Sequence, residues 1–151
     1  GRAGWIPVPE LAKAAADIGF VDITSPDRVP VIENYQGRPV KSLTLVALEM
    51  ATGVRAHVVS GERVILGKRQ IRIDEDNQIR LTRLDTRELP NVSFSALLEG
   101  KVDARQVRDK VVVIGYDGSK MHALTLPTGP IKAHRLFYVG LLDAFGQLAA
   151  P

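Results

Sequence analysis

The run Lys110-Val111-Val112-Val113-Ile114-Gly115 is the strongest indication of the fold in this sequence. An uninterrupted series of β-branched residues that ends in glycine is typical of a strand buried on both faces, as in parallel sheets. We therefore predict a central strand over residues 110–115. The polar loop 116–120 follows at the carboxyl end of this strand, which is where α/β proteins commonly bind ligands.

The rest of the chain supplies helices and further strands around this run. Alternating residues on either side of the acidic stretch 74–77 predict a β-hairpin near residues 69–84. Residues 42–51 are apolar on most sides, which predicts a buried helix that ends at Gly53. Apolar residues at the spacing of one helical face predict a last helix packed on the sheet: Phe137, Leu141, Ala144, Phe145 and Leu148. The predicted fold class is α/β, a layered sheet with packed helices.

Composition excludes several classes of protein. Hydrophobic residues make up 45% and charged residues 25% of the 151 residues, which excludes wholesale disorder. The absence of cysteine excludes disulfides, cysteine-ligated metals and thiol catalysis. The chain begins at Gly1 without an initiator methionine and has no apolar run long enough for a membrane helix. We interpret residues 1–151 as a single domain or as a large piece of a bigger one.

Positive charge gives little support to nucleic-acid binding. The formal charge is only +3, too small an excess to indicate such a partner on its own. Several arginines cluster around the predicted hairpin, at positions 63, 69, 72, 80, 83 and 87. Acidic residues 74–76 lie among them and few aromatic residues do, so we interpret this face as solvated and expect no nucleic-acid partner.

Polar residues after Gly115 are the candidate ligand contacts. The set comprises Tyr116, Asp117, Ser119, Lys120, His122 and His134. Only two residues separate Gly115 from Gly118, whereas a phosphate-binding loop of the Walker type has four, so a nucleotide site is not supported. The histidines lack a metal-ligand spacing, and we predict no metal, no cofactor and no catalytic residue. Lys120 and the start of the last helix favour an anionic ligand; the alternative is a polar turn without a ligand.

The order of several motifs resembles one known family. The matching pieces are Ile18-Gly19-Phe20-Val21, Asp27-Arg28-Val29-Pro30, the helix from Ser42, the 71–81 region, Phe94-Ser95-Ala96-Leu97-Leu98-Glu99-Gly100 and residues 108–115. Together they resemble the C-terminal half of the type-two CHASE domain over most of residues 9–148. The chain departs from that pattern where Thr125-Leu126-Pro127 interrupts a Thr-Pro pair, and where residues 121–123 stand near the expected acid.

The resemblance implies an extracytoplasmic, non-enzymatic sensor, with residues 1–151 as a single domain or as the C-terminal part of a larger extracytoplasmic sensory domain. Such modules face the periplasm or the exterior of the bacterial inner membrane in a membrane-anchored receptor. The expected partners are an unknown small-molecule or protein stimulus, flanking transmembrane helices, and a cytoplasmic cyclase or kinase output domain. An unfilled sheet edge also predicts a homodimer. Two alternatives stay open: a cytoplasmic α/β nucleotide-binding or enzyme domain that uses the loop after Gly115, and a structural dimerisation module.

Overall fold

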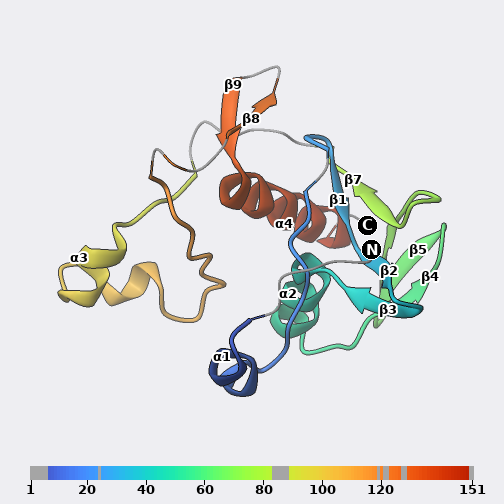
Figure 1. Ribbon diagram of the computed structural model, residues 1–151, viewed down its shortest axis with the longest axis horizontal. Coiled ribbons are helices and arrows are strands. Elements are labelled where there is room, and N and C mark those ends of the chain that lie inside the picture. Colours follow the sequence, from blue (N-terminus) through green and yellow to red (C-terminus); the bar gives the residue numbers. More distant parts are fainter. Residues whose placement is uncertain are drawn as a thin grey trace.

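The computed structural model describes residues 7–23, 25–82, 89–118, 120, 123–126 and 129–149. Its helices are α1 (Pro9–Ala14), α2 (Leu43–Thr52), α3 (Phe94–Leu98) and α4 (Ala133–Ala149), with a 3-10 turn η1 (Ala104–Gln106) (Figure 1). Its strands are β1 (Arg28–Pro30), β2 (Ile32–Tyr35), β3 (Arg38–Lys41), β4 (His57–Val59), β5 (Arg63–Leu66), β6 (Arg69–Arg72), β7 (Gln78–Arg80), β8 (Ala123–Leu126) and β9 (Gly129–Lys132). The predicted mixed α/β class is confirmed.

Strands of the described residues pair only in antiparallel fashion. They form a three-stranded sheet β4-β5-β6 and the two-stranded pairs β1-β7, β2-β3 and β8-β9. The hairpin predicted near residues 69–84 is wrong in its pairing, although β6 and β7 form within that range. β6 pairs with β5 across the turn at Gly67, and β7 pairs with β1. Alternation marks which face of a strand is buried, but it does not choose the neighbouring strand.

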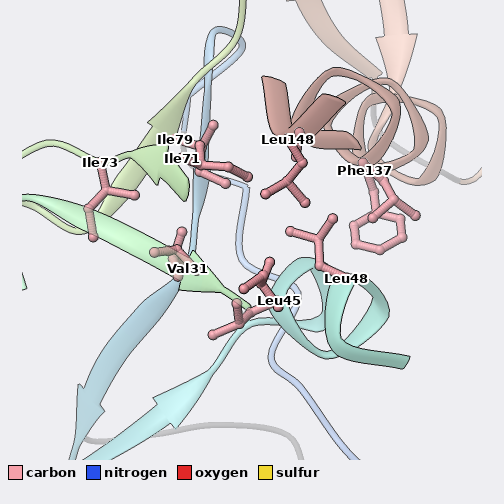
Figure 2. Packing of buried hydrophobic residues seen from close by; sticks show 12 residues of the cluster. Val31, Leu45, Leu48, Ile71, Ile73, Ile79, Phe137 and Leu148 are labelled. Atoms are coloured by element: carbon pink, nitrogen blue, oxygen red, sulfur yellow. The ribbon is translucent and has the colours of Figure 1, made fainter. Parts of the chain in front are cut away.

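The core lies between these strands and the helices α2 and α4. Figure 2 shows apolar side chains from the strands pointing toward those of the two helices. The predicted helical face is confirmed, since Phe137, Leu141, Ala144 and Leu148 are buried and Phe145 packs against the same cluster. The predicted buried helix is also confirmed as α2. Ser42 caps its start, and Gly53 ends it in the left-handed conformation.

The predicted central strand over residues 110–115 is wrong. Residues 111–117 belong to no helix or strand, and Val112 and Ile114 are 46% and 70% exposed. Val113 alone of this run packs against the core, and α4 lies instead on α2 and β6. The physical reason is that a strand needs neighbours for its backbone hydrogen bonds, and the described residues provide none beside this run.

A separate excursion of the chain precedes this run. α3 and η1 stand away from the body of the molecule (Figure 1), and neither contains a buried residue. Local capping holds both turns. The hydroxyl of Ser93 accepts a hydrogen bond from the backbone amide of Ala96, and the carboxylate of Asp103 accepts one from the backbone amide of Arg105. The run 111–116 then leads the chain back to the start of α4.

Candidate functional site

Three basic side chains surround the carboxylate of Asp117. Arg135 donates a hydrogen bond to its Oδ2 over 2.9 Å, and the Nζ of Lys132 lies 3.3 Å from its Oδ1. The Nε2 of His134 lies 3.7 Å from the same Oδ1. β9 runs directly into α4, so these three residues come from the end of a strand and the first turn of a helix. The positive end of the α4 dipole adds to their charge.

Lys132 also holds the backbone that carries Asp117. Its ammonium group donates to the carbonyl oxygens of Asp117 and Gly118, the second over 3.0 Å. The hydrogen bond from Lys132 lowers the pKa of the Asp117 carboxyl, partial burial opposes this, and the bond from Arg135 lowers it further. Asp117 is therefore ionised at neutral pH, and it faces two permanent positive charges. We call Asp117, Lys132, His134 and Arg135 together the basic cluster.

Gly118 lies close to a side chain of the same loop. A Cβ at position 118 would overlap the hydroxyl of Tyr116, so the tyrosine ring occupies the space that a side chain at 118 would need. Tyr116 itself is 59% exposed. Only glycine fits this close approach without movement of the aromatic ring.

An open hollow adjoins the basic cluster. It has a volume of about 290 Å³ and is lined by Asp117, Pro130, Ile131, Lys132 and Arg135. This volume lies at the lower end of the range for small-molecule sites. Its walls present one ionised carboxylate and two cations, and the N–H donors of the two cations suit an anion with several oxygen atoms.

The family of the chain is assigned by comparison of its sequence with models of known protein families. A model of the CHASE2 domain matches residues 4–138, which is most of the chain. The chain belongs to the CHASE2 domain family. CHASE2 domains are extracytoplasmic sensory domains, and the family is non-catalytic. No curated protein and no solved structure shows significant similarity to the chain. The matched residues include the whole basic cluster.

The predicted contact residues of this CHASE2 domain separate into three groups. Asp117 and His134 are brought together in the basic cluster, and Tyr116 fills the space beside Gly118. Lys120 is exposed and makes no hydrogen bond or ion pair in the part of the chain that the structure describes. Ser119 and His122 lie outside the described residues.

The sequence interpretation did not include Lys132 and Arg135. Both are hydrogen-bonded to the loop across 14 to 18 positions of the chain. The signal that could have found them is the basic sequence from Lys132 to Arg135 at the expected start of the last helix. Basic residues at a helix N-terminus oppose its dipole, and therefore call for a nearby anion.

A second charged cluster, around Glu49, is structural. The Glu49 side chain is 4% exposed. Its carboxylate accepts hydrogen bonds from the ammonium group of Lys41, 2.8 Å from each oxygen, and from the backbone amide of Ala56 over 2.7 Å. Arg55 joins Glu49 to Asp17. Burial raises the pKa of Glu49, but the hydrogen bonds from Lys41 and Ala56 outweigh it and lower the pKa overall. Two carboxylates meet two cations here, so the cluster has no excess charge to attract a ligand.

Neither a metal centre nor a membrane span is formed by the described residues. No set of three or more histidine, aspartate and glutamate side chains in these residues is arranged to hold a metal ion. Nor does any helix of the described chain combine the length and the apolar character needed to cross a bilayer.

Proposed function

We propose that this CHASE2 domain is the non-enzymatic sensor of a bacterial transmembrane receptor. It faces the periplasm or the cell exterior, acts as one sensory unit or as the C-terminal part of one, and relays a stimulus to a cytoplasmic cyclase or kinase. Membership of a sensory family supports this role. The observation that carries the proposal is the basic cluster, where one loop carboxylate bonds to Arg135 at the start of α4.

The stimulus, a small molecule or a protein, acts on the loop after Gly115 and on the first turn of α4. Contacts are expected from the six residues predicted from the sequence, namely Tyr116, Asp117, Ser119, Lys120, His122 and His134. α4 has 17 residues and packs through the core on α2 and β6, so it extends roughly 25 Å from the site. A change at its first turn is transmitted by displacing this packed helix, because a ligand shifts an equilibrium between two arrangements of packed elements.

A double substitution in the full receptor tests the proposed site. Asp117→Ala with Lys120→Ala is expected to abolish the response to the native stimulus while thermal unfolding of the domain is nearly unchanged. Glu99→Ala with Lys101→Ala is the matched control, because it removes one exposed carboxylate and one exposed cation that pair with each other outside the basic cluster. A normal response from the first variant contradicts the site, and so does an equal loss from the control.

A second candidate function rests on a different observation. The run Val111–Ile114 exposes apolar side chains and leaves its backbone unpaired within the described residues. This favours a module whose role is to pair two receptor chains. Ligand addition discriminates the candidates, because a ligand that binds only the folded sensor raises its unfolding temperature, whereas a pure dimerisation module is unaffected.

A further inference from the structure

We propose that the hollow beside the basic cluster binds a small oxyanion, of the phosphate or carboxylate class, and that this anion competes with Asp117 for Arg135 and Lys132. The inference rests on the proposed sensory function, and it names the ligand class and the way in which binding acts. In the absence of the anion, the carboxylate of Asp117 occupies the two cations that the anion would bind.

The balance of charge favours an anion. One carboxylate, that of Asp117, faces the permanent charges of Lys132 and Arg135 at 3.3 and 2.9 Å. His134 lies at 3.7 Å and adds a further positive charge whenever it is protonated. Both lysine and arginine line the hollow. The site is therefore positive overall even with Asp117 in place, and the N-terminal end of α4 increases this potential.

Arg135 retains unused donors for such an anion. A guanidinium group carries several N–H donors in a planar fork that matches two oxygens of a carboxylate or phosphate. Within the described residues, Arg135 makes a single hydrogen bond, from one terminal nitrogen to Asp117. Its side chain is 38% exposed. A ligand entering the hollow can form the paired hydrogen bonds that Asp117 leaves unmade.

His134 adds an orphaned polar atom next to the same cluster. Its Nδ1 is buried and has no hydrogen-bond partner among the described residues. Buried polar atoms of native proteins nearly always have a partner, so an isolated one calls for an explanation. A displacement of Asp117, or a ligand or water in its place, changes the surroundings of this imidazole. His134 is accordingly a natural reporter of occupancy.

Competition converts binding into movement of the chain. The loop is held to the end of β9 by the hydrogen bonds of Lys132 and to the start of α4 by that of Arg135. The preceding residues 111–116 make no backbone hydrogen bonds in the described part of the chain, and of these only Val113 packs on the core. Half-exposed ion pairs are individually weak, so an anion that takes over Arg135 releases the run that ends at Gly115.

Anion titrations of the 151-residue chain test the proposal. Sodium phosphate and, separately, sodium succinate are titrated at constant ionic strength, with chloride as the balancing salt and the His134 ring signals as the readout. Saturable binding of at least one anion is expected. Arg135→Gln is expected to weaken it roughly tenfold. Asp117→Asn is expected to strengthen it roughly fivefold, because the internal competitor is removed.

The controls separate this site from general electrostatics and from misfolding. Arg105→Gln removes an exposed arginine that also pairs with a carboxylate, Asp103, but lies outside the hollow, and it is expected to leave binding unchanged. Arg135→Lys keeps the charge without the fork and is expected to restore only part of the affinity. Thermal unfolding of each variant confirms that it is folded.

Each remaining outcome bears on one proposal. The oxyanion site is overturned if neither anion saturates, if Asp117→Asn weakens binding, or if Arg105→Gln weakens it as much as Arg135→Gln does. If neither anion binds while the Asp117→Ala, Lys120→Ala receptor loses its response, the ligand class is wrong and the sensory site stands. If an anion binds while that receptor responds normally, the oxyanion site stands and its sensory role is wrong.

Discussion

Gly115 and His134 are packed so closely that no side chain fits at position 115. A Cβ placed there would lie 2.6 Å from the Cβ and Cδ2 of the histidine and closer still to its Cγ. These atoms lie near the α4 backbone, so a rotation of the ring cannot remove the overlap. The backbone of the 111–118 run and the first turn of α4 therefore fit together only through glycine.

Gly115→Ala is expected to detach this run from α4. Overpacking of this kind costs about 1–3 kcal/mol where the chain cannot yield, and here the exposed run yields by moving away. The measurement is the chemical shift and pH titration of the His134 ring, together with thermal unfolding. Gly146→Ala is the control, because a Cβ at position 146 meets no atom within 4 Å. An unchanged His134 environment in Gly115→Ala would contradict the packing.

Glu49→Gln is expected to lower the free energy of unfolding by about 2 kcal/mol near neutral pH, since hydrogen bonds to a charged group are lost. The carboxylate accepts from Lys41 and from the amide of Ala56. Its pKa is lowered in the folded protein, so the unfolded chain binds its proton at a higher pH. The stabilisation is therefore present above the unfolded pKa, roughly 4.3, and is lost as pH falls through the lower folded pKa.

Urea unfolding of the wild-type chain and of Glu49→Gln, repeated over a range of pH, measures this difference in the free energy of unfolding. The free-energy gap between wild type and Glu49→Gln is expected to narrow as the pH falls below roughly 4. Glu62→Gln serves as the control, because this glutamate is exposed and pairs with Arg63, which is also exposed, and exposed pairs contribute little. A gap that is constant with pH would show that the Glu49 charge does not stabilise the fold.

Gly19→Ala tests how the N-terminal segment crosses the molecule. A Cβ at position 19 would lie 2.6 Å from the Cα of Leu43 and nearer to its amide nitrogen. The next residue, Phe20, exchanges hydrogen bonds with Lys41 and Leu43. We expect a loss of more than about 1 kcal/mol in urea unfolding, because a backbone neighbour cannot rotate away. Stability equal to that of Gly146→Ala would contradict this arrangement.

Local pattern predicted the core and its helices. The spacing of Phe137, Leu141 and Leu148 identified the buried face of α4, and Gly53 marked the end of α2. Capping and helical periodicity are properties of a few consecutive residues, so they can be read without the rest of the chain.

Pairing across the chain could not be predicted in this way. The run Val111–Ile114 has the composition of a strand, but β-propensity reports fit to a neighbouring surface, and the described residues place no strand beside it. The same limit applied to the site. Asp117 was expected from its position after Gly115, whereas Lys132 and Arg135 reach it only because the β8-β9 hairpin brings the chain back.

The exposed run also determines how two copies of the chain are expected to meet. Val112 and Ile114 are 46% and 70% exposed, and the backbone of residues 111–116 makes no hydrogen bond within the described part of the chain. Unpaired extended backbone with apolar side chains is a template for pairing with another chain. We therefore predict a homodimer in which the two 111–114 runs align.

Ile114→Lys tests this homodimer. A lysine in the paired run places like charges close together across the two-fold contact and removes apolar area, so the variant is expected to be a monomer. Light scattering after size exclusion, at a series of protein concentrations, measures the mass of each form. Leu142→Lys is the control, because Leu142 is an exposed apolar residue on α4 that lies outside the run, and its substitution is expected to leave the dimer intact. A wild-type chain that stays monomeric at every concentration contradicts the prediction. A monomer from Leu142→Lys with a dimer from Ile114→Lys moves the contact from the 111–114 run to the outer face of α4.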